Sequence, residues 1–350
     1  METTQLAPSF IVTGGCGFVG SNLVAQLQQR VPGCHVIVID SMRTGTFQTL
    51  VDACQRCGEH FRGEVLAKGV GEVLWDWLLK EHKPRAVFHL GAITDTTVDD
   101  EAVMIEQNAG LAWRVIVSAC AERDVPLVYA SSAATYGTPG QALRKEPFPE
   151  DAAGRPNNVY GFSKWLMEQV HRRISAERVS LGEKQPWIIG LRFFNVFGPG
   201  ESHKGSMASM AYQLTKQILA GGRPRLFEFG EQARDQVSVD DIVGICLASA
   251  GLGERGDPKP GIYNAGSGKV TSFEDVASAV RSGLGIAQAE RPTEFIPMPA
   301  SIRRFYQDYT CADMSLAASG LGFKPMHDPV EAIASYARWI ADTEDGMSVE

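Results

Sequence analysis

The sequence predicts an α/β fold, in which a doubly wound parallel sheet with helices on both faces is joined to a smaller α/β domain. Short, continuous apolar runs such as residues 9–13 and 86–90 are typical of strands buried on both faces. Helical patterns separate these runs, as the crossover connections between parallel strands require. A glycine-rich turn joins the first run to the first helix.

The elements follow one another in the order that such a fold requires. After the strand at 9–13, residues 21–29 form an amphipathic stretch with Leu23, Val24 and Leu27 on one face. Further strands are expected at 36–39, 86–90, 127–130 and 188–193. Beyond Gly198-Pro199-Gly200 the chain becomes irregular, which marks a change of domain.

Composition excludes several classes of protein. The formal net charge is -8, which argues against a general binder of nucleic acid or of anionic membranes. No apolar run approaches the ~18 residues of a membrane span, and the N-terminus lacks a signal-peptide pattern. We therefore expect a cytoplasmic protein. The seven scattered cysteines, with one C-x-x-C at Cys54 and Cys57, favour reduced thiols, and we expect no metal site.

The strongest motif is the glycine-rich turn after the first strand. Gly15, Gly17 and Gly20 form G-x-G-x-x-G, and Asp40 follows about 20 residues later at the end of a strand. Glycines permit a tight turn and let backbone N–H groups approach a pyrophosphate, while the helix N-terminus attracts its charge. This context predicts a dinucleotide site, with contacts at Gly14, Gly17, Phe18, Val19 and Gly20.

The residues after the second strand bear on which dinucleotide binds. Asp40 would accept a hydrogen bond from a ribose 2′-hydroxyl, which favours NAD. Arg43 would instead meet the 2′-phosphate of NADP, or it is a solvated loop cation. Ser41 lies between them and is a further expected contact. The motif leaves NAD and NADP both open.

A second group of residues, Ser132, Tyr160 and Lys164, is of the kind that performs acid/base chemistry. Tyr160 and Lys164 lie one turn apart if this segment is helical. A nearby ammonium favours tyrosinate and so lowers a phenol pKa from its free value of ~10. Ser132 follows the strand at 127–130, where the carboxyl end of a parallel strand faces the ligand crevice.

Taken together, the glycine turn, the Ser131-Ser132-Ala133 segment and Tyr160-x-x-x-Lys164 resemble the extended short-chain dehydrogenase/reductase family over most of the chain. This resemblance implies a Rossmann-type fold and a catalytic set of Ser132, Tyr160 and Lys164. It also implies that Tyr160 and Lys164 contact the cofactor. The other implied cofactor contacts are Leu90, Gly91, Ala92, Asn108 and Val196.

Further segments resemble one group within that family. Its dehydratases carry Thr-Asp-Glu where this chain has Ser132-Ala133-Ala134, so dehydration is disfavoured. Residues 193–199 and 201–209 resemble the ADP-glyceromanno-heptose 6-epimerases. The implied activity is NAD(P)-dependent epimerisation of a nucleotide-diphosphate sugar, by transient oxidation of a sugar carbon and return of hydride to the opposite face. NADP is slightly favoured by this resemblance. The alternatives are another epimerase, such as a 4-epimerase, or a one-way sugar reductase or dehydrogenase.

Epimerisation by redox is served by an acid/base group on each side of the reacting carbon. The resemblance assigns these roles to Tyr160 and Lys204, although Lys204 could instead bind the substrate diphosphate as a point charge. Arg234 would pair with that diphosphate, or with Asp235 or Asp240. The implied substrate contacts are Asn195, Ser206, Gln213, Phe227, Glu228, Arg234 and Tyr306.

These motifs define the expected domains. A dinucleotide-binding domain would comprise residues 1–193, with returns near 236–264 and 307–323. A substrate-binding domain would be assembled from 194–235, 265–306 and 324–350. We expect a homo-oligomer, since members of this family commonly self-associate.

Overall fold

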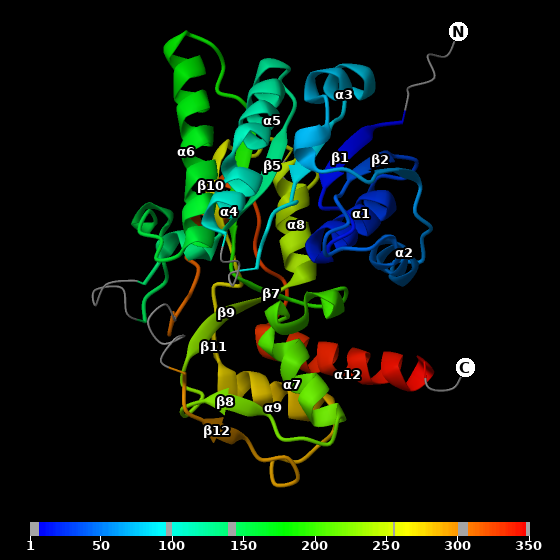
Figure 1. Ribbon diagram of the computed structural model, residues 1–350, viewed down its shortest axis with the longest axis vertical. Coiled ribbons are helices and arrows are strands. Elements are labelled where there is room, and N and C mark those ends of the chain that lie inside the picture. Colours follow the sequence, from blue (N-terminus) through cyan, green and yellow to red (C-terminus); the bar gives the residue numbers. More distant parts are fainter. Residues whose placement is uncertain (1–6, 96–99, 139–144, 255, 300–306, 348–350) are drawn as a thin grey trace.

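The computed structural model describes residues 7–95, 100–138, 145–254, 256–299 and 307–347. Its larger lobe, uppermost in Figure 1, is built on a parallel sheet of seven strands in the order β10-β6-β5-β4-β1-β2-β3. The predicted fold class is thereby confirmed. The strands are β1 (Ser9–Thr13), β2 (His35–Ile39), β3 (Gly63–Leu66), β4 (Ala86–His89), β5 (Leu127–Ser132), β6 (Ile188–Phe193) and β10 (Gly261–Ala265).

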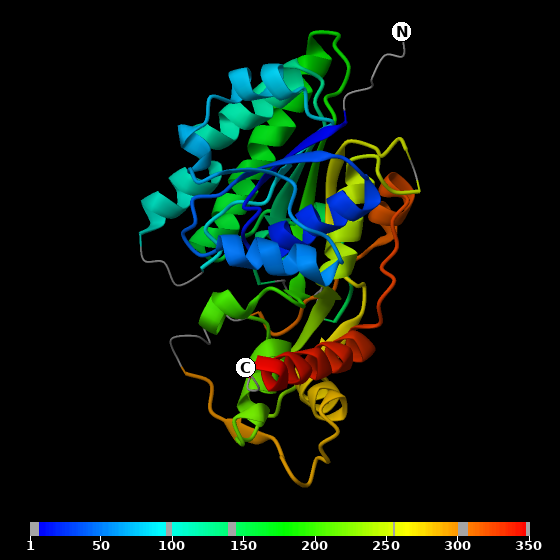
Figure 2. The ribbon, with the colours of Figure 1, turned by 90° about the vertical axis from the view of Figure 1, so that its right-hand side faces the viewer.

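Helices cover both faces of this sheet, as Figure 2 shows. They are α1 (Phe18–Arg30), α2 (Phe47–Arg56), α3 (Trp75–His82), α4 (Glu101–Ala109), α5 (Leu111–Glu122), α6 (Val159–Ser180), α8 (Val239–Ser249) and α11 (Ser315–Leu321). Side chains alternate along β1, so Phe10 and Val12 join the core shared with α1 and α8. Ile11 joins the opposite core, which contains Trp113 of α5. Burial on both faces explains why these strands are continuously apolar.

The smaller lobe lies below the carboxyl ends of the large sheet (Figure 1). It contains a three-stranded sheet, β11-β9-β7, and a two-stranded sheet, β12-β8. Its elements are β7 (Asn195–Phe197), α7 (Met210–Leu219), β8 (Arg225–Phe227), β9 (Ala233–Ser238), β11 (Val270–Ser272), α9 (Phe273–Gly283), β12 (Glu294–Ile296) and α12 (Pro329–Met347). Both α8 and β10, which lie in the return expected near 236–264, pack in the larger lobe.

The strand order sets where a ligand can bind. From β1 the chain adds β2 and β3 on one side and then crosses to add β4 on the other. Such a reversal opens a crevice at the carboxyl ends of β1 and β4. A buried ion pair stabilises the strands beside it: Arg192 Nε and Nη2 donate to the two carboxylate oxygens of Glu168 at 2.8 and 2.7 Å, and Ser131 Oγ donates to Glu168 at 2.6 Å.

Candidate active site

The glycine turn is held by close backbone contacts that leave no room for side chains. A Cβ on Gly20 would lie 2.0 Å from Gly14 O. Gly14 has φ of 69°, and a Cβ there would lie 2.7 Å from Gly91 N. The turn therefore packs directly on the loop after β4, which the sequence predicted to border the same site. In that loop Leu90 N donates to Thr13 O.

The first turn of α1 is open toward an anion. The helix begins after Gly17, whose position offers no side-chain cap to the first N–H groups. A Cβ on Gly17 would lie 3.3 Å from Gly14 O, which is a tight contact but much looser than the 2.0 Å at Gly20, so the packing of the turn restricts Gly17 less than Gly20. Uncapped N–H groups at Phe18, Val19 and Gly20, together with the helix dipole, fit the pyrophosphate of a dinucleotide.

Asp40 organises the far side of this turn. Its Oδ2 accepts a hydrogen bond from Cys16 N and its Oδ1 accepts one from Met42 N, both at 2.9 Å. Each carboxylate oxygen keeps a second lone pair for a ribose hydroxyl. Ser41 and Arg43 are exposed beside it, in a loop whose Met42 adopts φ of 55°.

Asn108 supports the site from behind. Its Oδ1 accepts from Ile93 N at 2.8 Å, and its Nδ2 donates to Ile93 O and to Ser163 Oγ at 3.0 Å each. The side chain is 1% exposed, and these bonds tie the loop after β4, which carries Ala92, to α6. Asn108 is one of the expected cofactor contacts, and in this structure its amide contacts protein groups.

The three expected catalytic residues come together at the start of α6. Tyr160 shares a side-chain hydrogen bond with Ser132. Because Ser132 Oγ already accepts from Ala134 N at 3.1 Å, its proton is free to be donated to the phenol. Lys164 Nζ lies 6.0 Å from the centroid of the Tyr160 ring and donates to Ala130 O at 2.9 Å.

The pKa of Tyr160 differs in direction from our expectation. Burial raises the pKa of Tyr160, and the hydrogen bond from Ser132 offsets only part of that rise. The expected lowering by the Lys164 ammonium is therefore wrong for this structure. The reason is that Lys164 is itself buried, which lowers its pKa to about 7, so that much of it is neutral near pH 7. His89, buried nearby, has its pKa lowered to about 3 by desolvation and then by Lys164.

Lys204 comes to the start of α1, the candidate dinucleotide site, from a different element. It lies in the 3-10 helix η5 (Ser202–Met207), and its Nζ is 5.2 Å from the ring centroid of Phe18, at the start of α1. Ser206 is exposed on the same segment. Gln213 Nε2 donates to Ser206 O at 3.1 Å and to Ala208 O at 2.7 Å, so this amide steadies the segment.

The small three-stranded sheet gathers two of the expected substrate residues. Asn195 is in register with Gln236, and Arg234 lies two residues before Gln236 on β9. Side chains in register or two apart share a face, so Asn195 and Arg234 lie on the same face of this sheet. Asp235 points to the other face, where it accepts from Ala312 N, Ser267 N, Ser267 Oγ and Gly268 N. Val196, an expected cofactor contact, pairs with Val237 in the same sheet.

The remaining expected residues lie elsewhere. Phe227 ends β8 and Glu228 follows it with φ of 52°, in the two-stranded sheet near the bottom of Figure 1. Tyr306 lies outside the described residues. Gln307, the next residue, donates to Gly137 O in the loop after β5.

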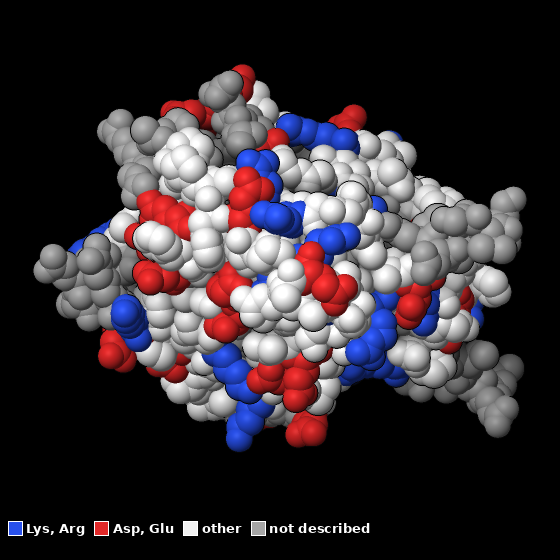
Figure 3. Space-filling view, turned by 90° about the horizontal axis from the view of Figure 1, so that it is seen from below, with Lys and Arg blue, Asp and Glu red and all other residues white. Residues whose placement is uncertain are grey.

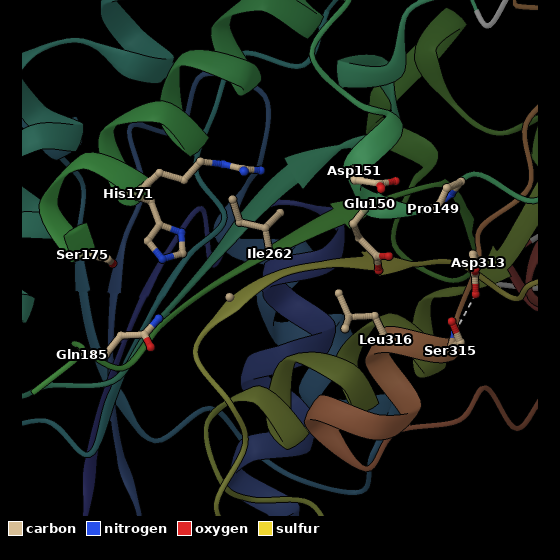
Figure 4. A pocket seen from close by; sticks show the side chains of 12 residues that line it. Pro149, Glu150, Asp151, His171, Ser175, Gln185, Ile262, Asp313, Ser315 and Leu316 are labelled. Carbon is tan, nitrogen blue, oxygen red and sulfur yellow. Dashed lines mark hydrogen bonds between the residues drawn. The ribbon is translucent and has the colours of Figure 1, made fainter. Parts of the chain in front are cut away.

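A groove with a cavity volume of about 590 Å³ lies between α6, β10 and the start of α11 (Figure 4). It follows the edge strand β10 and is bordered by His171 of α6, Glu150 and Leu316. It contains none of the expected site residues. Glu150 links it to the buried network, since Arg192 Nη1 donates to Glu150 O at 2.6 Å.

Sequence reasoning missed two residues that organise the site. Thr13 Oγ1 accepts from Gly91 N at 3.0 Å and shares a hydrogen bond of 2.9 Å with Nδ1 of the buried His89. Glu201 is 0% exposed and anchors the segment that carries Lys204. Both stand within motifs that were noted. The partners of Thr13 come from the distant strand β4 and its loop, whereas Glu201 bonds Gly198 and Ser209 nearby in the chain and Tyr336 on α12, so the full set of contacts is visible only in three dimensions.

The described residues contain no group of three or more His, Cys, Asp or Glu side chains that could hold a metal. Among the described helices, none is both long and apolar enough to cross a bilayer. All seven cysteines are free thiols. Figure 3 shows Lys and Arg interspersed with Asp and Glu on the face seen from below.

Over residues 10–266 the chain matches the NAD dependent epimerase/dehydratase family. The chain therefore belongs to this family of nucleotide-sugar enzymes, and the resemblance inferred from the motifs is confirmed.

Solved structures of that kind superpose over nearly the whole chain. ADP-L-glycero-D-manno-heptose-6-epimerase of Helicobacter pylori is 29% identical, with a TM-score of 0.80 and coverage of 97% of this chain and 98% of that one. UDP-glucose 4-epimerase of Thermotoga maritima is 23% identical, with a TM-score of 0.78 and coverage of 96% and 99%. The UDP-glucose 4-epimerase of Stenotrophomonas maltophila, solved with bound NAD, is 23% identical, with a TM-score of 0.79 and coverage of 97% and 99%.

Proposed function

We propose that this protein is an NAD(P)-dependent nucleotide-sugar epimerase, and specifically an ADP-glyceromanno-heptose 6-epimerase. The observation that carries the proposal is the position of a second lysine. Lys204, on η5 beyond β7, lies against Phe18 at the start of α1, the helix that follows the glycine turn. Tyr160 and Lys164 belong to a different helix, α6. The likeness to the Helicobacter pylori heptose epimerase over almost all of both chains supports the same substrate class.

The chemistry of the site suits a reaction that needs two proton carriers. When bound, the dinucleotide supplies a hydride acceptor and donor and, in its oxidised form, a positive charge. Tyr160 takes the proton of the sugar hydroxyl in its phenolate form, which the hydrogen bond from Ser132 and the positive charge of the oxidised dinucleotide would favour against the effect of burial. Buried Lys164 holds Ala130 O and keeps α6 in register with β5. Once the sugar carbonyl has turned, Lys204 donates a proton from the other side.

Binding roles follow from the same placement. We assign Arg234 to the substrate diphosphate, since guanidinium pairs with phosphate oxygens, and Asn195 to the sugar on the same face. Asp40 supports NAD and Arg43 supports NADP, and the mass of the dinucleotide released on denaturation separates the two. The other proposed substrate residues are Ser206, Gln213, Phe227, Glu228 and Tyr306.

We also propose that the chain self-associates through α4, α5 and α6, which lie side by side in the larger lobe. Leu111 and Val115, one turn apart on α5, are 69% and 41% exposed. Phe162 of the adjoining α6 is 42% exposed and Val103 of α4 is 41% exposed. Exposed apolar side chains gathered on neighbouring helices are typical of an interface.

The proposed activity is tested by incubating the enzyme with ADP-D-glycero-D-manno-heptose and following inversion at C6 by NMR. An epimerase inverts the sugar with no net change in nicotinamide absorbance. A one-way reductase or dehydrogenase instead changes the nicotinamide absorbance in proportion to the amount of sugar that it reduces or oxidises. Inversion of a UDP-hexose at C4 instead would select the 4-epimerase alternative.

Tyr160→Phe tests the acid/base assignment. We expect kcat to fall at least about 100-fold, because the group that moves the proton is lost. The bound dinucleotide, measured by mass after denaturation, should stay at the wild-type level. Tyr263→Phe is the matched control: Tyr263 lies on β10, its hydroxyl donates to Lys259 O, and this variant should retain turnover. Full activity of Tyr160→Phe would refute the assignment.

A further inference from the structure

The Glu201 carboxylate bonds both ends of the segment that carries Lys204, residues 198–209. Its Oε1 accepts from Gly198 N at 3.2 Å and from Ser209 Oγ at 2.7 Å, and its Oε2 accepts from Ser209 N at 2.6 Å. Lys204 N donates to Glu201 O at 3.0 Å. One buried carboxylate therefore joins both ends of the segment, and Lys204 lies between them.

The same segment is held between the two lobes. On the smaller lobe, the Tyr336 hydroxyl of α12 hydrogen bonds to the Glu201 carboxylate. On the larger lobe, Asn22 Nδ2 of α1 donates to Pro199 O at 2.9 Å, and Arg56 Nη2 of α2 donates to Asn22 Oδ1 at 3.0 Å. Glu201 is thus the point at which the segment is tied to α12.

Burial and the opposite charge nearby act in opposite directions on the pKa values of Glu201 and Lys204. A fully buried carboxylate is costly unless donors and a cation face it. Burial raises the pKa of Glu201, and the nearby Lys204 together with the donors Ser209 and Gly198 offsets part of that rise. Burial likewise lowers the pKa of Lys204, and the charge of Glu201 offsets part of that fall. The other titratable groups that face this pair are His203 on the segment, which faces Lys204, and Tyr336 on α12, which faces Glu201. Asp40 in turn acts on His203, and Tyr212 on α7 and Arg56 on α2 act on Tyr336.

We propose that Glu201 is a positioning residue for the reaction: it fixes Lys204 beside the dinucleotide helix and provides the counter-charge that keeps its amine protonated for donation. This inference rests on the proposed function, in which Lys204 is the second acid/base group. It assigns a role to a residue whose carboxylate bonds protein groups on its own segment.

Glu201→Gln tests the proposal because it keeps the shape of the side chain and removes its charge. In the holoenzyme, the pH dependence of Lys204 acetylation by acetic anhydride, read by mass spectrometry, reports the titration of its amine without turnover. We expect the labelling midpoint, and the basic limb of the kcat profile, to fall by about one pH unit. The value of kcat should fall roughly tenfold or more, with KM and dinucleotide content within about twofold of wild type.

Tyr336→Phe is the matched control. It removes one hydrogen bond to Glu201 and keeps the charge, so the labelling midpoint should remain at the wild-type pH. If Glu201→Gln lowers kcat while midpoint and basic limb stay unchanged, the role of Glu201 is only structural and the proposal is overturned.

Two further variants keep the outcome decisive. If Glu201→Gln no longer holds its dinucleotide, Glu201→Asp is measured instead. The shorter side chain keeps the negative charge but places it farther from the Lys204 amine, so the pH midpoint of Lys204 acetylation should fall by a smaller amount. An unmoved midpoint in Glu201→Asp overturns the proposal. Lys204→Met separates this inference from the proposed function, because wild-type kcat in that variant refutes the acid/base role of Lys204 itself.

Discussion

Lys164→Met should stabilise the folded protein while removing a residue of the proposed catalytic set. The Lys164 side chain is 2% exposed, and burial lowers its pKa from the ordinary 10.5 to about 7. Methionine fills a similar volume without a charge. The gain arises because the wild-type protein must either bury an ammonium or release its proton on folding.

The magnitude follows from that pKa. At about 1.4 kcal/mol per pH unit, a fall from 10.5 to about 7 corresponds to roughly 5 kcal/mol at and below pH 7. Loss of the hydrogen bond from Lys164 Nζ to Ala130 O offsets about 2 kcal/mol of this. We therefore expect Lys164→Met to raise the free energy of unfolding by about 3 kcal/mol at pH 6.

The dependence on pH has a definite sign. The folded-state pKa lies below the unfolded one, so between pH 7 and 10.5 the unfolded chain binds more protons at this residue. Wild-type stability therefore rises through that window relative to the variant, and the advantage of methionine disappears near pH 10. Guanidinium unfolding of both proteins, freed of dinucleotide and followed by circular dichroism at pH 6 and pH 10, measures the difference. An equal difference at both pH values, or destabilisation at pH 6, would refute the reasoning.

Two further predictions concern packing and assembly. Gly20→Ala should abolish dinucleotide binding and destabilise the fold by about 2 kcal/mol or more, because its Cβ would lie 2.0 Å from Gly14 O. Gly17→Ala, with 3.3 Å to the same atom, should weaken dinucleotide binding in calorimetry while keeping the melting temperature, and an equal loss of stability in both would contradict this account. Phe162→Glu should convert the proposed oligomer to monomer in light scattering. Val179→Glu, also exposed on α6, is the control, and an unchanged mass in Phe162→Glu would exclude this interface.

The local features of the dinucleotide site could be predicted from the sequence because each depends on neighbours in the chain. Gly14 and Gly20 stand where a turn needs positive φ or close backbone approach, and such requirements are visible in a single segment. The apolar runs likewise predict strands buried on both faces. Pairing of Tyr160 with Lys164 needs only the period of one helix.

The rest depends on contacts between distant segments. Asn108 could be recognised by its position, but its bonds to Ile93 and Ser163 depend on how α4 meets α6. The direction of the Tyr160 pKa depends on burial, which spacing along a helix does not reveal. The place of Lys204 at Phe18 depends on how the smaller lobe meets the larger one.

The sequence by itself therefore determined the fold class, the glycine turn and which residues to propose as the catalytic set. Only the tertiary structure decided the burial of that proposed set and the hydrogen bonds by which Glu201 joins the two ends of the segment that carries Lys204. The physical reason is range: backbone conformation and side-chain periodicity are set within a few residues, whereas desolvation and hydrogen-bond partners are set by whatever the whole chain packs around a group.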